Sequence, residues 1–346
     1  MTEIAVDLIS DTVTRPTPAM RRAIAEAEVG DEQNREDPTV NRLQEKVAEL
    51  LGTEAALFLP SGTMCNQVAF AVHCRPGDEI LLHELAHPLL YEAGGPAALV
   101  GAIMRPLSGA RGLYTAEQVR QAVRPRVHYM PRTRVLSVEQ TANIVGGVCW
   151  PLAQIQEVCA AGHAAGLACH MDGARLMNAV VASGTPARAF ARPFDSVWLD
   201  LTKGLGAPVG AVLAGSRAFI EEAWVFKQRF GGSMRQAGII AAAGIHALDH
   251  HVDRLAEDHE RARLLARGLA DLPGLAVDAD RVETNIVIFD VRGTGLTGEE
   301  FGRRTGRFGV RFSVLGPTLV RAVFHLDVPA DGVERALSAA RAALRG

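Results

Sequence analysis

Near-continuous apolar runs alternate with helical patterns over most of the chain. The apolar runs predict buried strands at 55–59, 79–82, 100–107, 135–138, 167–171, 197–201 and 209–213. The intervening segments carry residues that begin or end helices, such as Pro38, Thr115 and Gly166. Strands that are apolar on both faces and joined by helices are typical of a parallel sheet covered on both sides. The pattern therefore predicts an α/β fold with a mostly parallel central sheet flanked by helices.

The pattern changes toward the C-terminus. A single helical segment over 237–272 is long enough to leave the first domain. Three shorter strands follow it, at 286–289, 310–314 and 319–325, with helices between and after them. We therefore expect an N-terminal arm, a large domain and a smaller C-terminal α+β domain, over residues 1–18, 19–250 and 251–346. The arm is too polar for a strand buried on both faces.

Composition narrows the class of protein. The formal net charge of −3 and the scattered arginines disfavour a protein that binds nucleic acid or a membrane surface. No apolar stretch approaches the ~20 residues of a membrane span, and residues 1–3 begin no signal peptide. The five cysteines are odd in number and lack Cys-x-x-Cys spacing, so we expect core thiols rather than disulfides or a metal site. These features predict a cytoplasmic protein.

One lysine is a candidate for covalent chemistry. Only three lysines, Lys46, Lys203 and Lys227, occur among 36 lysines and arginines, and Lys203 stands between a predicted strand and a glycine-rich turn. Arginine stays protonated, whereas a buried lysine can lose its proton and form a Schiff base with pyridoxal phosphate. The simpler alternative is an ordinary surface lysine after a strand.

Two other strand ends carry residues suited to such a cofactor. Ser61-Gly62-Thr63 follows a strand and opens a helix, where free amides attract an anion, although Ser61 can equally be a helix cap. Asp172 ends the predicted strand 167–171, on the side of an open α/β sheet where ligands bind. There its carboxylate could keep a pyridine nitrogen protonated, or it could cap the next helix.

Histidines and arginines supply further candidates. His83 and His87 lie just after the strand at 79–82, where an imidazole could stack on a ring or move protons. Arg235 follows a glycine-rich turn and could bind a phosphate, and Arg321 on a predicted strand could bind a carboxylate. Structural roles for the histidines, and solvation of Arg321, remain the simpler alternatives.

Together these residues form a known pattern. The sequence resembles the L-threonine aldolases of the low-specificity or L-allo-threonine type, which are pyridoxal-phosphate enzymes of the aspartate-aminotransferase-like fold (fold type I). The matching segments are 7–16, 36–41, 60–64, 86–87, 92–95, 171–175, 203–210, 231–236, and Arg321 with 325–327. Asp-Gly-Ala-Arg at 172–175 and Lys-Gly-Leu-Gly-Ala-Pro-Val-Gly at 203–210 are the most specific.

The resemblance implies a role for each matching residue. Lys203 would hold pyridoxal 5'-phosphate as a Schiff base, Asp172 would pair with its ring nitrogen, and His87, preferred to His83, would stack on the ring. The residues expected at the cofactor phosphate are Ser61, Gly62, Thr63 and, from a neighbouring subunit, Arg235. The residues expected at the substrate carboxylate are Ser10, Arg175 and Arg321, of which Arg175 also belongs to the cofactor site. His128 matches a family histidine near the substrate hydroxyl.

The implied reaction cleaves L-threonine, L-allo-threonine and related β-hydroxy-α-amino acids to glycine and an aldehyde. His87, His128 or a water molecule would remove the β-hydroxyl proton. Family members are homotetramers, dimers of dimers that share active sites. The alternatives are a β-eliminating lyase or racemase on the same scaffold and a non-catalytic cofactor-binding protein. The sequence departs from the family pattern at Ile9, Asn34-Arg35, Ala142 and Ser233. The first three lie in segments expected to shape the substrate side of the pocket, so they bear on the preferred β side chain and on threo/erythro selectivity.

Overall fold

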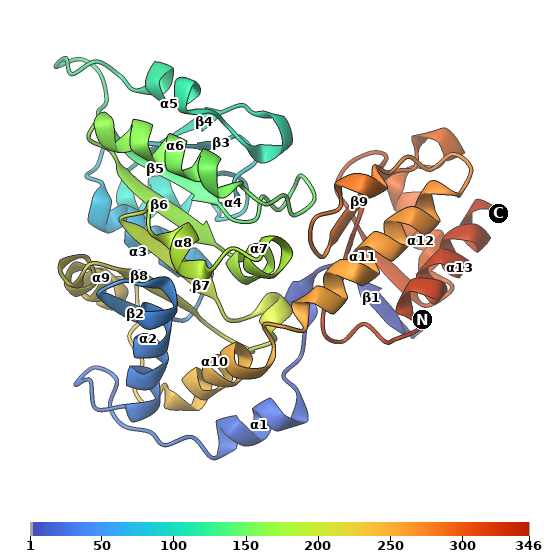
Figure 1. Cartoon of the computed structure of the whole chain (residues 1–346), viewed down its shortest axis with the longest axis horizontal. Coiled ribbons are helices and arrows are strands. Elements are labelled where there is room, and N and C mark those ends of the chain that lie inside the picture. The colour runs from blue at the N-terminus through green and yellow to red at the C-terminus, as the bar shows by residue number, and fades with distance from the viewer. Residues whose placement is uncertain (1–2, 346) are drawn as a thin grey trace.

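The larger sheet has seven strands in the order β2-β8-β7-β6-β5-β3-β4. The computed structural model describes residues 3–345 (Figure 1). The strands are β2 (Ala55–Leu59), β3 (Glu79–His83), β4 (Ile103–Leu107), β5 (Thr133–Glu139), β6 (Ala168–Gly173), β7 (Ser196–Asp200) and β8 (Ala211–Gly215). Neighbours run parallel except at β8, which is antiparallel to β7 and β2. The prediction of a mostly parallel central sheet is confirmed.

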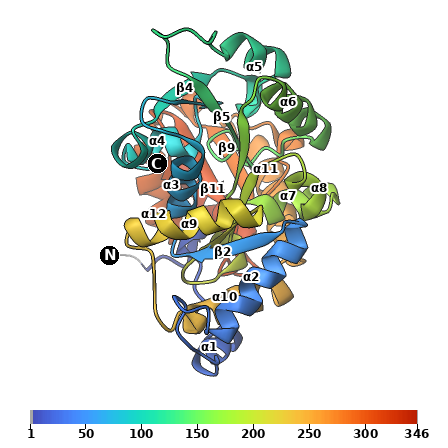
Figure 2. The same cartoon turned by 90° about the vertical axis from the view of Figure 1, so that its left-hand side faces the viewer.

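Helices cover both faces of this sheet, as expected for strands that are apolar on both sides (Figure 2). One face packs against α3 (Gly62–His73) and α9 (Arg217–Arg229). The helices packed on the other face are α2 (Pro38–Leu51), α6 (Leu152–Ala164), α7 (Leu176–Ser183), α8 (Ala187–Ala191) and α10 (Gly238–His250). Three further helices, α1 (Pro18–Ala25), α4 (His87–Leu90) and α5 (Ala116–Ala122), complete this part of the chain.

The smaller sheet draws on both ends of the chain. Its order is β1-β10-β11-β9, from β1 (Val6–Leu8), β9 (Ile286–Asp290), β10 (Val310–Val314) and β11 (Leu319–Val323). The N-terminal segment adds β1 parallel to β10, with Val6 opposite Val310. Helices α11 (Leu255–Ala270), α12 (Gly298–Gly306) and α13 (Gly332–Leu344) share a core with this sheet. Segments about 300 residues apart therefore build one core.

Two expected elements differ from the structure. The single helix over 237–272 was wrong: α10 ends at His250 and α11 begins at Leu255, so the second helix can cross to the small sheet (Figure 1). At the break, the His251 ring hydrogen-bonds the carbonyl oxygen of Leu205 over 2.7 Å, which anchors the chain beside the turn after Lys203. The strand expected from residue 100 begins at Ile103, because Pro96–Val100 forms a helical turn.

The described residues bear on two expectations from composition. No helix within residues 3–345 has the length and apolarity needed to span a bilayer. All five cysteines are free thiols, and four of them are buried.

Candidate active site

A cavity of about 660 Å³ opens between the two sheets, and most of the predicted site residues line it. Those residues are Ser10, Ser61, Gly62, Thr63, His87, Asp172, Arg175, Lys203 and Arg321. His128 and Arg235 are exposed and are not among its lining residues. The cavity lies where β6 and β7 end, the position at which open α/β sheets bind ligands. Lys203 and Asp172 therefore share one crevice.

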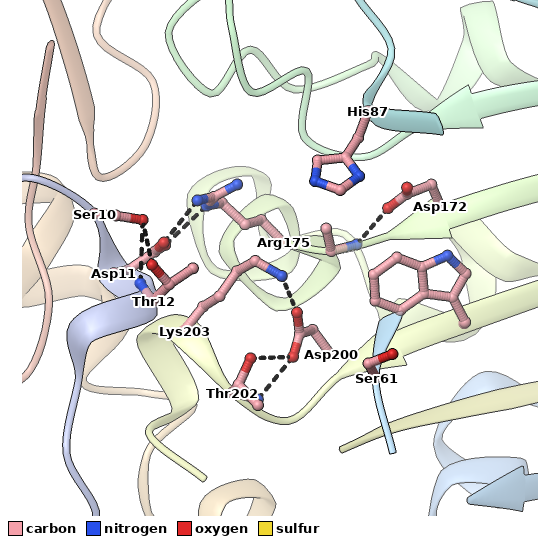
Figure 3. A network of polar contacts seen from close by, with 12 residues as sticks. Ser10, Asp11, Thr12, Ser61, His87, Asp172, Arg175, Asp200, Thr202 and Lys203 are labelled. Carbon is pink, nitrogen blue, oxygen red and sulfur yellow. Dashed lines mark hydrogen bonds and ion pairs between the residues drawn. The ribbon is translucent and has the colours of Figure 1, made fainter. Parts of the chain in front are cut away.

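Lys203 reaches the cavity from a strained turn. The residue has a φ of 55°, in the left-handed region that disfavours side chains, and it begins the short helical turn Lys203–Leu205. Its side chain is 19% exposed, and Nζ forms an ion pair with Asp200 Oδ2 (Figure 3). Nζ also lies 5.8 Å from the centre of the Trp198 ring. The amine is thus partly shielded from water yet open to the cavity.

Asp172 is a buried carboxylate that forms no ion pair with a lysine or arginine within residues 3–345. Oδ1 accepts a hydrogen bond from the Ala174 amide at 3.0 Å, and Oδ2 accepts one from Asn66 Nδ2 at 2.9 Å. Burial, assisted by the charge of Glu139, raises the pKa of Asp172 to about 7. A positive charge placed against this carboxylate would favour its ionised form. Asp172 therefore suits a protonated ring nitrogen.

Asn66, on α3, joins the acidic groups of the site. Its Nδ2 donates to Glu92 Oε1 at 2.7 Å as well as to Asp172, and its Oδ1 accepts from Trp198 Nε1 at 2.7 Å. His170 Nε2 lies 3.1 Å from the same Oδ1. Burial lowers the pKa of His170 to about 3, so this imidazole is neutral at physiological pH. The side-chain amide of Asn66 is therefore fully engaged, which fixes the orientation of Asp172.

His87 stands over the cavity, whereas His83 does not line it (Figure 3). Its Nδ1 lies 3.0 Å from Glu92 Oε1, and its backbone amide donates to Glu139 Oε2 at 2.7 Å. Burial alone would lower the pKa of His87, but the hydrogen bond to Glu92 and the charge of Asp172 outweigh it and raise that pKa. His83 is buried, with Nε2 bonded to the Gly109 carbonyl. The geometry supports the preference for His87.

The N-terminus of α3 forms a cradle for an anion. Ser61 Oγ caps the helix by accepting from the Met64 amide at 3.1 Å, and this cap leaves the amides of Gly62 and Thr63 unused. A Cβ atom at Gly62 would lie 2.3 Å from the Trp198 ring, so only glycine permits the helix end to approach so closely. Amides at a helix N-terminus attract phosphate. Ser61 is thus both a cap and part of the cavity wall.

Two guanidinium groups face the opposite end of the cavity. Arg175 forms a two-pronged, buried ion pair with Asp11 at 2.8 and 2.6 Å, and this pairing outweighs burial to lower the pKa of Asp11 to about 2. Arg321 has no such partner: Nη1 donates to Asn143 Oδ1 at 3.0 Å, and the buried Nε donates to nothing among residues 3–345. Burial, with Arg175 nearby, lowers the pKa of Arg321. The two arginines and Asp11 therefore give this end an excess of one positive charge, which suits a carboxylate.

Several residues of the site were not identified as functional from the sequence. Asn66 sits within an ordinary helical pattern, and no spacing signals that it bonds to both Glu92 and Asp172. Glu92 lies inside the matching segment 92–95, but no role was inferred for it from the sequence. Asp11 lies inside the matching segment 7–16, and Asp200 lies three residues before Lys203, so both were open to notice.

Comparison with known proteins gives one family. The sequence profile of the beta-eliminating lyases matches residues 7–293. The low-specificity L-threonine aldolase 1 of Arabidopsis thaliana is 39% identical, over 96% of this chain and 95% of its own. The low specificity L-threonine aldolase of Escherichia coli (strain K12) is 41% identical, over 93% and 94% of the two chains.

Solved structures share the fold at low identity. A threonine aldolase from Leishmania major is 17% identical and superposes with a TM-score of 0.81, covering 98% of this chain and 99% of its own. A serine palmitoyltransferase from Sphingomonas wittichii, also 17% identical, gives a TM-score of 0.77 over 99% and 87% of the two chains. At these identities the likeness concerns the fold alone.

Proposed function

Because this chain belongs to the beta-eliminating lyase family, and within it to the low-specificity L-threonine aldolases, we propose that it cleaves L-threonine and L-allo-threonine to glycine and acetaldehyde. It is a carbon–carbon lyase, and related β-hydroxy-α-amino acids would release the corresponding aldehydes. The observation that carries the proposal is one cavity holding the Lys203 amine, the Asp172 carboxylate and the Arg321 guanidinium, whose Nε has no hydrogen-bond partner among residues 3–345.

The residues present fit pyridoxal 5'-phosphate. We propose that Lys203 holds its aldehyde carbon, Asp172 its ring nitrogen and the α3 N-terminus its phosphate, with His87 against the ring. The raised pKa of Asp172 and the tight approach that Gly62 permits support this assignment. When bound, the cofactor supplies an electron sink for the carbanion left at Cα. Arg175 lines the same cavity while Asp11 holds its guanidinium, and we propose that it borders both the cofactor and the substrate carboxylate.

The chain's own groups select the bond that breaks. Arg321 and Ser10 would bind the substrate carboxylate. This contact would prevent rotation about the bond between the substrate nitrogen and Cα, so that the Cα–Cβ bond takes the reactive orientation. His87, directly or through a water molecule, would take the β-hydroxyl proton, because Glu92 holds its Nδ1 and the rest of the ring borders the cavity. His128 does not line the cavity of its own chain, so it would take part in the reaction only at the cavity of a neighbouring subunit.

We propose a homo-oligomer that shares its active sites, with Arg235 binding the phosphate of a neighbouring copy. The exposed Arg235 is held by Asp31 at 3.3 Å, outside its own cavity, which supports a role across an interface. Mixing inactive Lys203→Ala and Arg235→Ala chains tests this arrangement. If sites are shared, subunit exchange places one intact site in each mixed pair and restores activity. If each chain is self-sufficient, the mixture stays inactive.

One assay tests the reaction. Purified protein loaded with cofactor is incubated with L-threonine, L-allo-threonine, D-threonine and phenylserine, and the products are identified. Glycine with acetaldehyde or benzaldehyde is the expected result for the L-substrates. Ammonia with an oxo acid would indicate β-elimination instead, and an inverted amino acid would indicate racemisation. Absence of any product with every substrate would indicate a protein that only binds the cofactor.

A further inference from the structure

Asp200, the last residue of β7, uses its two carboxylate oxygens for different partners. Oδ1 accepts from the Thr202 amide at 2.8 Å and from the Thr202 hydroxyl at 2.6 Å. Oδ2 faces the other way and pairs with Lys203 Nζ (Figure 3). The side chain is buried, at 5% exposure. One oxygen therefore shapes the turn, and the other binds the amine that the turn carries.

The turn needs such support. Lys203 adopts a φ of 55°, and for a residue with a side chain this region costs roughly 1–2 kcal/mol. Aspartate favours tight turns because its side chain can accept the amide two residues ahead, which is the contact seen with Thr202. This contact alone would explain an aspartate at position 200. It does not explain the ion pair to Nζ.

The charges around the pair leave Asp200 as the counter-charge of the amine. Arg175 attracts Asp200 electrostatically, and Asp11 attracts Lys203. However, Arg175 and Asp11 form a buried ion pair with each other, so their charges largely cancel. Cys65 on α3 also faces Asp200, and burial raises the pKa of that thiol well above its usual range, so it stays uncharged. Asp172, on the adjacent strand, is bound by Asn66 and Ala174.

We propose that Asp200 is a positioning residue for the reactive amine. Whenever Lys203 Nζ is not covalently bound, Asp200 Oδ2 stabilises its protonated form and fixes the direction in which the side chain points. This inference rests on the proposed function, in which Lys203 must be free before the cofactor binds and again while substrate occupies the site. A carboxylate at hydrogen-bond distance stabilises the ammonium form over the neutral amine. Release of this proton to Oδ2 leaves a lone pair on Nζ and a neutral carboxyl on Asp200.

The two functions of Asp200 can be separated by substitution. Asparagine keeps an oxygen that can accept from Thr202, but it carries no charge, and the NH2 group that takes the place of Oδ2 cannot accept from an ammonium group. Asp200→Asn therefore removes the ion pair and retains the turn. Thr202→Val is the matched control, because it removes one hydrogen bond to Oδ1 and leaves the charge pair in place.

The small number of lysines makes a direct measurement possible. Full-length, cofactor-free protein is pulse-labelled at a series of pH values with trace acetic anhydride, which acylates only neutral amines, and each lysine peptide is quantified by mass spectrometry. Lys46 is exposed on α2, away from the cavity, and provides an internal reference in every sample. Lys227 is buried against Glu32 and contributes little signal.

We expect the labelling midpoint of Lys203 to fall by about one pH unit or more in Asp200→Asn, which is about a tenfold faster reaction at neutral pH. The midpoint of Lys46 should not move, and Thr202→Val should leave the Lys203 midpoint within about a third of a unit. An unchanged Lys203 midpoint in folded Asp200→Asn overturns the proposal. If that variant fails to fold, Asp200→Ser, whose hydroxyl can accept from the Thr202 amide, takes its place.

Failure here is distinguishable from failure of the proposed function. The labelling involves neither cofactor nor substrate, so a shifted midpoint supports the role of Asp200 even if threonine is not cleaved. Conversely, threonine cleavage together with an unshifted midpoint rejects the role of Asp200 and leaves the aldolase assignment intact.

Discussion

The two ends of the cavity are built in opposite ways. The cofactor end, consisting of Asp172, Asn66, Glu92 and His87, belongs entirely to the large sheet and its helices, and Asn66 ties its acidic groups into one network. The proposed carboxylate end, consisting of Ser10, Asp11, Arg175 and Arg321, comes from three segments far apart in the sequence. Within the described part of the chain, Arg321 Nε has no hydrogen-bond partner. The polar groups of the first end are linked by hydrogen bonds within the chain, whereas the second end keeps a donor that no group among residues 3–345 accepts from.

The largest effect is expected from removing the residue between the two ends. Lys203→Ala should abolish cofactor-linked absorbance and reduce turnover by about 10³-fold or more, because no other amine lines the cavity within residues 3–345. Spectra and product assays check both expectations. Lys46→Ala, at an exposed lysine paired with Asp249, is the matched control and should behave as wild type. Turnover close to normal in Lys203→Ala would exclude the proposed chemistry.

At the cofactor end, Asp172→Asn should reduce kcat by about 10²- to 10³-fold. Asparagine has the same shape and keeps one acceptor oxygen for the Ala174 amide, so the fold should persist. Its NH2 group cannot accept the bond from Asn66 Nδ2, and the side chain offers no negative charge to a ring nitrogen. Steady-state kinetics, with circular dichroism as the check on folding, measure this. A kcat within about threefold of wild type would show that the charge of Asp172 is not used.

At the carboxylate end, the two arginines should respond differently. Arg321→Ala should lower kcat/KM by about 10- to 100-fold, mainly through KM, since a charge-assisted hydrogen bond contributes about 1.5–3 kcal/mol. Its Tm should hardly change. Arg175→Ala should instead cost about 3–5 kcal/mol of stability, because Asp11 would remain buried without its counter-charge. Equal losses of Tm in both variants would contradict the contrast between the two ends.

The smallest expected effects are pH shifts of opposite sign in the cofactor-free protein. The pKa of Asp172 is raised from 3.8 to about 7, so its contribution to stability is present below pH 3.8 and is lost as the pH rises through about 7. The pKa of Asp11 is lowered from 3.8 to about 2, so its contribution is present above pH 3.8 and is lost as the pH falls toward 2.

Thermal melts of wild type, Asp172→Asn and Asp11→Asn across this range give the two difference curves. Each curve should change by on the order of a few degrees, the first at near-neutral pH and the second in acid. Difference curves with the same slope would remove the electrostatic distinction between the ends. The contribution of the buried, neutral His170 is common to all three proteins and cancels in the differences. The pKa of His87 is raised partly by Asp172, so the Asp172→Asn curve also contains the resulting change at His87.

Sequence reasoning succeeded where a residue's position follows from local pattern. Apolar runs marked the strands of the large sheet, and parallel strands bring their carboxyl ends to one edge, so Asp172 and Lys203 were expected in one crevice. Ser61 and Gly62 were located by the same logic at the end of β2. The rule works because strand direction, not a specific contact, decides where these side chains lie.

It failed where position depends on contacts between distant segments. Asn66 occupies a helical position that looks like core, and only the packing of α3 against β6 and β7 brings it to Asp172. The break between α10 and α11 coincides with a contact from His251 to Leu205, which the helical pattern of the sequence does not reveal. The pairing of β1 with β10 joins the two ends of the chain, and it decides where Ser10 and Asp11 stand.

That last pairing sets an order of events during synthesis. A chain emerging from the ribosome exposes Val6–Leu8 first and must wait for Val310–Val314 before this strand has a partner. Loop closure over so long a separation is among the slowest steps in folding, and the N-terminal segment stays open to wrong partners until then. Only after Val310–Val314 has been made can β1 join its sheet and bring Asp11 to its buried ion pair with Arg175, so this end of the cavity is assembled late in synthesis.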